Sequence, residues 1–327
     1  MTVRHSVIMI CYNQEHFIEA ALDSVLCERI KPDEIIIGDD ASTDGTLKIL
    51  DQYAAKYPKI IKVISHATNL GIFGNLNSVA PYATGDMVHF LSGDDWFKPG
   101  LIEKMNKTIL DMKLEPRKSR FILLPHVILH YLDGSEVTIK NNTKKLMRYG
   151  AVGAVLRDVV HTRQVGYSRA LFDLWPMFPE YSQIIGPWAD RLQHVMFAQH
   201  IDRQIVMDCD GSVYRVGVGV ASRTKRQELM KSYQRALIGL ENIHKCGGLE
   251  LNCVDRKYLD FHKNATQLSI AYSVELLKNT LRSAVSLAAA SIVDVGYIIK
   301  GLYQAHRSMA VRLIRKVSQD QSEKGSA

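Results

Sequence analysis

Ser92-Gly93-Asp94-Asp95-Trp96 follows the apolar run of residues 87–91, and this stretch decides how the first part of the chain folds. A short apolar run that ends in two adjacent acids is typical of a buried strand that brings carboxylates to the rim of a sheet. In open α/β sheets, ligands bind outside the carboxyl ends of the strands. The pair therefore predicts either a cation site or a solvated turn before a helix.

Three further, mainly apolar segments precede this stretch, at residues 6–11, 34–38 and 60–64, and the first is a continuous apolar run. Continuous apolar runs are typical of strands that are buried on both faces of a sheet. Helical patterns separate most of these runs, and this alternation predicts βαβ units and a parallel sheet. The sequence therefore indicates an α/β fold.

Beyond residue 113 the pattern is less regular, and after residue 219 it becomes mostly helical. We expect a mobile loop at 133–149, because that segment is polar, basic and poor in pattern. Three apolar stripes at helical spacing follow, and the last runs from Leu281 to Leu302. The other elements expected here are strands at 120–131, 165–167 and 204–207 and a helix at 188–200.

The amino-acid composition indicates a globular protein and the kind of partner it could bind. With 46% hydrophobic and 23% charged residues among 327, the chain has an ordinary globular composition. Its net charge of +7 favours anionic partners. No basic run interleaved with aromatic residues occurs, so we predict no nucleic-acid partner.

The five cysteines form no CxxC pair, so neither a disulfide framework nor a zinc site is predicted, and a reducing compartment is favoured. The start of the chain lacks the features of a signal peptide, and no run of 18 uncharged apolar residues occurs. We therefore expect a cytoplasmic protein.

Side chains suited to a nucleotide follow three of the predicted strands. Tyr12 offers a ring on which a base can stack, and such stacking contributes ~1–3 kcal/mol. Asp40 can accept hydrogen bonds from a base or a ribose. Asp94 and Asp95 can hold Mg²⁺ or Mn²⁺, which prefer carboxylate and phosphate oxygens. Because parallel strands share one carboxyl edge, we predict a cleft for a nucleoside diphosphate.

Five pieces of the sequence, in this order and spacing, resemble the nucleotide-sugar-binding half of glycosyltransferase family 2, of the kind that builds bacterial surface polysaccharides. They are residues 6–13, 21–26, 34–46, 69–71 and 85–95. The resemblance implies the GT-A fold, which is Rossmann-like with a mostly parallel sheet flanked by helices, here with a helical C-terminal region. On this basis we expect a nucleotide-sugar-binding half at 1–112, an acceptor-binding half of the same domain at 113–218, and helices at 219–327.

Residue by residue, the resemblance implies that Cys11, Tyr12 and Asp40 contact the nucleoside. It also implies that Asp94 lies near the donor sugar or ribose and that Asp95 coordinates the metal. The chain departs from the commonest pattern at Ser92, where the family often has a further acid, and at Leu76, where many members carry Arg. The first departure leaves open how Asp94 and Asp95 share the metal.

Family 2 enzymes invert the anomeric centre, and the resemblance implies a general base in the second half of the domain. Asp190, which follows Gly186-Pro187-Trp188, fits the usual position of that base at the start of a helix. An acid in the first turn of a helix is also favoured by the helix dipole alone. The competing acids are Asp173, Asp202 and Asp208.

Other residues extend the expected site. Arg215 belongs to a Tyr-Arg segment that loosely resembles one in polysaccharide-building members, and it either holds the diphosphate or pairs with an acid. His161 is a candidate for the acceptor pocket. Basic residues follow the last apolar stripe, so that stripe either lies on an anionic membrane surface or packs on its own domain. These residues are Arg307, Arg312, Arg315 and Lys316.

The sequence thus predicts a metal-dependent, inverting glycosyltransferase with Mg²⁺ or Mn²⁺ as cofactor. Its donor would be a UDP- or dTDP-sugar, and its acceptor a saccharide or lipid-linked saccharide. Two other classes stay open. One is a non-catalytic nucleotide-sugar-binding module. The other is a nucleotidyltransferase, although residues 12–16 do not form the Gly- and Arg/Lys-rich phosphate loop that such enzymes normally have after the first strand.

Overall fold

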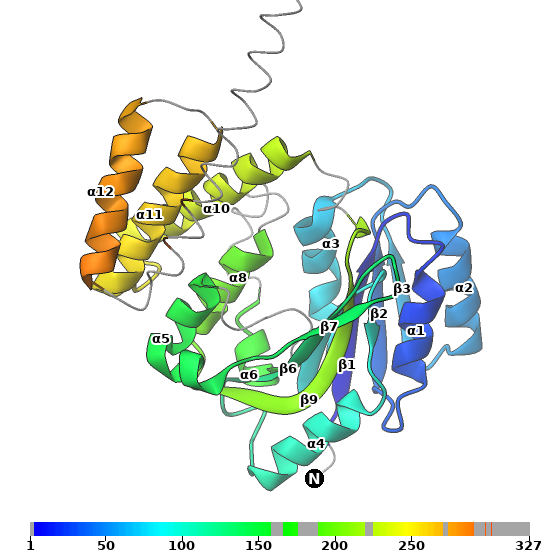
Figure 1. Ribbon diagram of the computed structural model, residues 1–327. Helices are drawn as coiled ribbons and strands as arrows, with labels where there is room; N and C mark the ends of the chain where they lie inside the picture. Colours follow the sequence, from blue (N-terminus) through cyan, green and yellow to red (C-terminus); the bar gives the residue numbers. More distant parts are fainter. Residues whose placement is uncertain are drawn as a thin grey trace, which may run out of the picture. The chain divides into compact units, whose positions relative to one another are not determined.

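The computed structural model describes residues 3–157, 166–175, 189–219, 225–270 and 274–290, together with residues 298 and 302. The chain divides into two compact units. The first comprises Met1–Gln183 and Ala189–Arg223, and the second comprises Ile184–Trp188 and Thr224–Ala327. The sheet belongs to the first unit, whereas the described elements of the second unit are helices (Figure 1).

Four parallel strands form the first part of the sheet, in the order β3-β2-β1-β4. Each lies on one of the predicted apolar runs. In β1, the adjacent residues Val7 and Ile8 point to opposite faces, and both are at most 1% exposed, which is why its apolar run is continuous rather than alternating. The strands are β1 (His5–Cys11), β2 (Glu34–Asp39), β3 (Ile61–Ser65) and β4 (Met87–Ser92).

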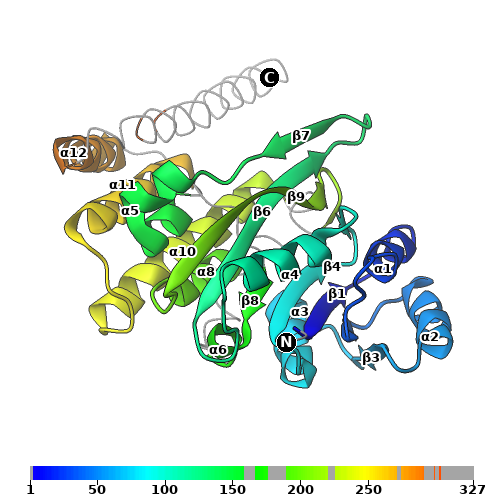
Figure 2. The ribbon, with the colours of Figure 1, turned by 90° about the horizontal axis from the view of Figure 1, so that it is seen from below.

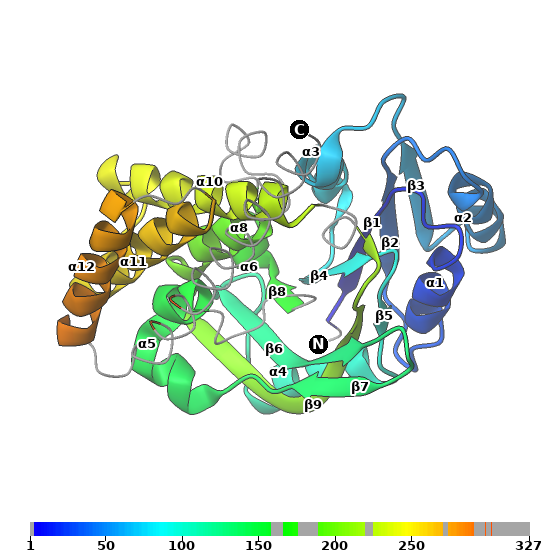
Figure 3. The same cartoon turned by 45° about the horizontal axis from the view of Figure 1, so that its top comes forward.

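Helices cover both faces of these strands (Figures 1 and 3). On one face, apolar residues of α1 (Ile18–Leu26), α2 (Thr46–Lys56) and α4 (Leu101–Asp111) form a common core with β1 and β2. On the other face, α3 (Gly71–Val79) contacts β1 and β2. This layering confirms the predicted α/β class.

The second part of the sheet mixes strand directions. From β4, the order continues β8-β6-β9-β5, and β7 pairs with the free side of β6. Only β6 and β9 are parallel neighbours among the described strands here, and they run side by side in Figures 2 and 3. The elements are β5 (Trp96–Phe97), β6 (Phe121–His130), β7 (Glu136–Ile139), α5 (Thr143–Leu156), β8 (Gly166–Ser168), α6 (Arg169–Phe172), α8 (Ala189–Ala198) and β9 (Arg203–Arg215).

The loop predicted at 133–149 is wrong, because this segment contains β7 and the start of α5. The strand β7 has β6 as its only described partner, and its Val137 is 47% exposed, so burial imposes no apolar pattern on it. At the start of α5, the side chain of Asn142 accepts a hydrogen bond from the Lys145 amide at 3.0 Å. The helix is kinked at Gly150, whose φ is 68°.

The strand predicted at 204–207 continues to Arg215. Its pairing with β6 shifts register on either side of His126, where polar, exposed Asp208 and Asp210 interrupt the apolar pattern. At this bulge Gly211 lies against Pro125, and a Cβ atom on Gly211 would come within 2.5 Å of the Pro125 ring. The extension is important because it carries β9 to the acid pair.

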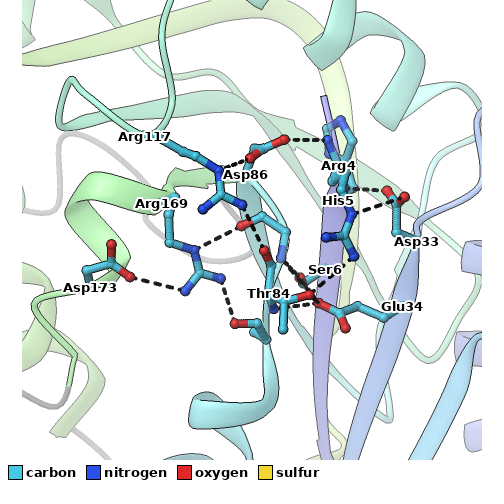
Figure 4. A network of polar contacts seen from close by, with 12 residues as sticks. Arg4, His5, Ser6, Asp33, Glu34, Thr84, Asp86, Arg117, Arg169 and Asp173 are labelled. Atoms are coloured by element: carbon cyan, nitrogen blue, oxygen red, sulfur yellow. Dashed lines mark hydrogen bonds and ion pairs between the residues drawn. The ribbon is translucent and has the colours of Figure 1, made fainter. Parts of the chain in front are cut away.

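A polar network ties the two parts of the sheet together at the amino edge of the parallel strands (Figure 4). Arg117 forms an ion pair with Asp86 at 2.5 Å, and Asp86 also accepts a hydrogen bond from the Arg4 amide at 2.9 Å. Arg169, at the start of α6, donates to the carbonyls of Gly85 and Ala83 at 2.9 and 2.7 Å. These contacts fix the turn that leads into β4.

The described helices of the second unit are α10 (Arg226–Lys245), α11 (Cys253–Ile270) and α12 (Val274–Ala290), and α11 packs against both others. The first two predicted stripes are buried at positions such as Leu240 and Leu268. In α12, Leu281 and Val285 of the third stripe are 47% and 70% exposed, whereas Leu287, which is not part of that stripe, is fully buried. Along the described ranges, no helix is long and apolar enough to cross a membrane.

Candidate functional site

The carboxyl ends of β1, β2 and β4 meet at one edge of the sheet. In the register of the strands, Cys11 pairs with Asp39, and Ile10 pairs with Ser92. The turns that follow are also linked, because the Asp40 amide donates to the Cys11 carbonyl at 3.0 Å and the Gly93 amide donates to the Ile10 carbonyl at 3.1 Å. The structure therefore brings together the strand ends on which the sequence placed the nucleotide site.

The surroundings of Cys11 suit a residue that supports the fold. Its side chain is buried, and the thiol donates to the Gly38 carbonyl at 3.5 Å and lies 3.7 Å from the Asp39 carboxylate. Burial, together with the nearby Asp39 charge, raises the pKa of the Cys11 thiol far above its ordinary value. The thiol is therefore neutral and not a nucleophile at physiological pH.

Tyr12 is exposed at the rim, and a left-handed residue follows it. The Tyr12 side chain is 41% exposed. Asn13 has a φ of 52°, a conformation that Asn tolerates better than most residues. Its side chain accepts a hydrogen bond from the Thr43 amide at 2.8 Å, and its own amide donates to the Ser42 hydroxyl at 2.9 Å. The loops after β1 and β2 therefore hold each other in place around Tyr12.

Asp40 is buried and holds the start of α3. Its Oδ1 accepts a hydrogen bond from the Leu70 amide at 2.7 Å, and its Oδ2 accepts one from the Gly71 amide at 3.0 Å. Amides at a helix start lack partners within the helix, and a carboxylate there is favoured by the helix dipole. Asp40 thus orders the loop that follows β3 at the predicted nucleoside edge.

Asp94 and Asp95 are 6% and 4% exposed, so this stretch is not a solvated turn. Ser92, which stands where the family often has a third acid, donates a hydrogen bond from its hydroxyl to Asp94 Oδ1. Asp95 Oδ1 accepts a hydrogen bond from the Arg215 amide at 2.9 Å. The acid pair is therefore held from the end of β9 as well as from its own strand.

Gly219 packs directly against the acid pair. Its φ is +72°, and a Cβ atom on this residue would lie 2.8 Å from Asp94 Oδ2. Both facts require glycine here, because other residues are strained at this φ and a side chain would displace the carboxylate. Gly219 was not among the residues predicted from the sequence, although two glycines shortly after a strand are a recognisable signal of close backbone approach.

The carboxylate oxygens of Asp94 and Asp95 are suited to binding a divalent cation. Two adjacent buried carboxylates are the donor type that Mg²⁺ and Mn²⁺ take. No cationic side chain of the described residues forms an ion pair with Asp94. Within the described ranges, no group of three or more His, Cys, Asp or Glu side chains is placed to hold a metal ion. The chemistry of the pair fits a cation that takes further ligands from phosphate and water.

The predicted base, Asp190, belongs to the first turn of α8, and its side chain lies outside the described residues. His161 also lies outside them. Two competing acids are engaged elsewhere. Asp173 pairs with Arg169 at 3.2 Å, and Asp202 pairs with Arg120 at the same distance.

The third competitor, Asp208, contacts His126 at 3.1 Å, and its side chain is 98% exposed. His130, on the same strand as His126, contacts Glu136 at 3.4 Å. His126 and His130 therefore each contact a different acidic residue.

Part of the chain matches a known family. The model of glycosyl transferase family 2 matches residues 6–113. The chain is 36% identical over 166 residues to an uncharacterized protein of Mycobacterium tuberculosis, an overlap that covers 50% of this chain and 46% of that protein. It is 44% identical over 99 residues to the candidate glycosyltransferase EpsE of Bacillus subtilis, covering 30% of this chain and 36% of EpsE. The chain spans about half the length, or less, of the curated relatives it matches.

Solved structures show the fold. The crystal structure of S. aureus TarS 1–349 in complex with UDP aligns with a TM-score of 0.58 at 16% identity, covering 95% of this chain and 91% of that one. The mannosyltransferase PcManGT of Pyrobaculum calidifontis, in complex with GDP-Man and Mn²⁺, aligns with a TM-score of 0.51 at 16% identity, covering 96% and 76%. The fold is therefore GT-A, and residues 6–113 match glycosyl transferase family 2.

Proposed function

We propose that this protein is an inverting glycosyltransferase that moves a sugar from a nucleoside diphosphate to a saccharide or lipid-linked saccharide in glycan assembly. One observation carries the proposal. Within the segment that matches the family, the ends of three parallel strands bring Tyr12, Asp40 and the acid pair to a single edge of the sheet. Ligands of open α/β sheets bind at this edge.

The donor would lie across these strand ends. The exposed ring of Tyr12 is suited to stacking on the base, and Asp40 is suited to accepting hydrogen bonds from it. Asp94 would then lie near the ribose or the donor sugar. We assign Cys11 a supporting part, because its thiol is buried against Gly38. A uridine donor is supported by TarS, which was solved with UDP, and a thymidine donor stays a second candidate.

Asp95 would hold the divalent cation, with Asp94 beside it. When bound, Mg²⁺ or Mn²⁺ would neutralise charge on the leaving diphosphate. The two carboxylates supply hard oxygen ligands that are already fixed by Ser92 and by the Arg215 amide. PcManGT, which was solved with Mn²⁺, lends support from a protein of the same fold.

Asp190 would act as general base on the acceptor side. In the proposed step, a hydroxyl oxygen of the acceptor forms a bond to the anomeric carbon while the bond from that carbon to the diphosphate oxygen breaks. The hydroxyl proton passes to the Asp190 carboxylate, and the nucleoside diphosphate leaves on the opposite face, which inverts the configuration. The position of Asp190 in the first turn of α8, within the same compact unit as the acid pair, supports this assignment.

The test is release of nucleoside diphosphate from a panel of UDP- and dTDP-sugars with Mn²⁺, with and without saccharide and lipid-linked acceptors. We expect Asp190→Asn to bind donor as the wild type does and to lose transfer. Near wild-type turnover in this variant would show that the base is another residue. Donor binding without turnover of any sugar in the wild type would instead favour a non-catalytic binding module.

We also propose that the second unit contacts an anionic membrane surface. On α12 the exposed apolar residues Leu281 and Val285 alternate with the basic residues Lys278 and Arg282. An apolar stripe edged by basic residues can lie in a membrane interface. Arg307, Arg312, Arg315 and Lys316, which extend the basic character, lie outside the described residues. The protein should pellet with anionic liposomes at low salt, and a failure to pellet would rule this out.

A further inference from the structure

Arg215 is the last residue of β9, and it contacts both members of the acid pair through hydrogen bonds. Its Nε donates to the carbonyl oxygen of Asp94 at 3.0 Å, and its backbone amide donates to Asp95 Oδ1 at 2.9 Å. The sequence left open whether Arg215 pairs with an acid or holds the diphosphate. Among the described residues, no carboxylate forms an ion pair with its guanidinium group.

Two aromatic rings hold that guanidinium group in place. Its carbon atom lies 4.8 Å from the centre of the Phe17 ring and 4.6 Å from the centre of the Trp96 ring. Both distances lie well within the range of cation–π attraction, which extends to about 6 Å. Phe17 directly precedes α1, and Trp96 directly follows the acid pair. Three segments that are far apart in the sequence therefore meet at one cation.

This arrangement leaves most of the donors of Arg215 unused by the described residues. A guanidinium group has five N–H donors, of which Nε uses one here. Along the described ranges, no acceptor takes a hydrogen bond from either Nη atom. A cation that is fixed by aromatic rings and one carbonyl, rather than by a carboxylate, keeps its charge available for an anion.

We propose that Arg215 binds the diphosphate of the donor through its Nη atoms, and that Phe17 and Trp96 are positioning residues that hold its guanidinium group beside the acid pair. This inference rests on the proposed function, because it needs a nucleoside diphosphate at the same edge. The planar group is suited to paired hydrogen bonds with phosphate oxygens. Since the rings restrict a long side chain before the ligand arrives, less conformational entropy is lost on binding.

The test compares a nucleoside with its diphosphate, because only the diphosphate should depend on Arg215. Affinities for uridine and UDP, and for thymidine and dTDP, are measured by calorimetry with Mn²⁺ for the full chain. Arg215→Ala should weaken diphosphate binding by about 10- to 100-fold and leave nucleoside binding unchanged. Arg215→Lys should give an intermediate loss, because its ammonium group neither stacks nor forms paired hydrogen bonds in the same way.

The positioning residues are tested in the same assay. Phe17→Leu and Trp96→Leu should weaken diphosphate binding by about 2- to 10-fold. Trp96→Phe keeps an aromatic ring and should therefore retain most of the wild-type affinity for the diphosphate. The matched control is Tyr82→Leu, which removes the ring that Lys62 Nζ contacts at 3.5 Å and should change neither affinity. Circular dichroism and urea unfolding confirm that each variant is folded.

The outcomes separate this inference from the function on which it rests. Equal losses of nucleoside and diphosphate affinity in Arg215→Ala would overturn the diphosphate role. Unchanged affinity in both ring variants would overturn the positioning role. If the wild type bound neither diphosphate, the proposed function itself would fail, and this inference would fail with it.

Discussion

The backbone amide of Arg215 donates a 2.9 Å hydrogen bond to Oδ1 of Asp95, although the two residues are 120 positions apart in the sequence. This bond joins the last strand of the sheet to the acid pair that follows β4. Because the Asp95 side chain is buried, loss of the carboxylate would leave the Arg215 amide without its acceptor.

Comparing Asp95→Ala with Asp95→Asn should therefore distinguish the contribution of this carboxylate to folding stability from its contribution to metal binding. Alanine removes the acceptor of the Arg215 amide and should lower the free energy of unfolding by about 1–3 kcal/mol. Asparagine keeps an acceptor oxygen and should cost less, while both variants lose the negative charge. Urea unfolding measures the stability, and thermal scans with UDP and Mn²⁺ measure the binding. A Mn²⁺-dependent rise in melting temperature that persisted in Asp95→Asn would exclude Asp95 as a metal ligand.

Asp40→Ala should affect both stability and nucleoside binding. The buried carboxylate accepts hydrogen bonds from the Leu70 and Gly71 amides, so its removal should cost about 1–3 kcal/mol of unfolding free energy. Uridine affinity should fall as well, because the loop beside the base loses its anchor. Asp51→Ala, on the exposed side of α2, is the control and should change neither quantity. Unchanged uridine affinity in Asp40→Ala would remove Asp40 from the site.

Gly219→Ala should damage the site more than it damages the fold. Alanine at φ +72° costs about 1–2 kcal/mol, and its Cβ atom would also displace the Asp94 carboxylate. Gly134→Ala is the matched control, since Gly134 has a φ of +84° and a Cβ atom there would have open space within 4 Å. We expect similar losses of stability in the two variants and a loss of diphosphate binding in Gly219→Ala alone. Equal binding in both would show that the contact with Asp94 is unimportant.

Stability should fall in mild acid because of a buried histidine pair. His5 Nδ1 lies 2.8 Å from His89 Nε2, and the rings are stacked. Burial lowers the pKa of His5, and it lowers the pKa of His89 well below the ordinary 6.5. Below that value the unfolded chain takes up protons that the folded chain does not, so stability is present above pH ~6.5 and is lost as the pH falls.

The buried pair predicts that the free energy of unfolding falls as the pH decreases below ~6.5. Urea unfolding at several pH values measures it. His89→Gln should flatten the pH dependence, whereas His16→Gln, at an exposed side chain, should leave it unchanged. A His89→Gln profile parallel to that of the wild type would contradict the assignment.

The sequence was most informative where burial imposes a simple pattern. Strands β1, β2 and β4 are largely buried on both faces, so their apolar runs marked them. The shared carboxyl edge followed from the parallel direction of these strands and of the edge strand β3, whose Lys62 is exposed. The same reasoning failed for β7, which is exposed, and for β9, where a bulge at Asp208 and Asp210 breaks the pattern. In α12, the buried residues Thr280, Ala284 and Leu287 lie off the apolar stripe, whose Leu281 and Val285 are exposed.

Only those site residues that lie in the first hundred positions of the chain could be predicted from the sequence. Tyr12, Asp40 and the acid pair follow strands that the sequence reveals, so their meeting could be foreseen. The contacts made by Arg215, Phe17 and Gly219 could not, because they depend on how far β9 extends and on where it ends. Residues that meet through the pairing of strands far apart in the sequence have no characteristic sequence spacing from which the contact could be predicted.

The most direct test of the account is calorimetric titration of the full chain with UDP and with dTDP, in Mn²⁺ and in EDTA, for the wild type and Asp95→Asn. We predict that the wild type binds at least one of the two in Mn²⁺. Its affinity should fall at least about tenfold in EDTA and in the variant, as expected for loss of a charged interaction. Failure to bind either nucleotide, or binding unaffected by both EDTA and Asp95→Asn, would contradict a metal-assisted nucleotide-sugar site at this edge.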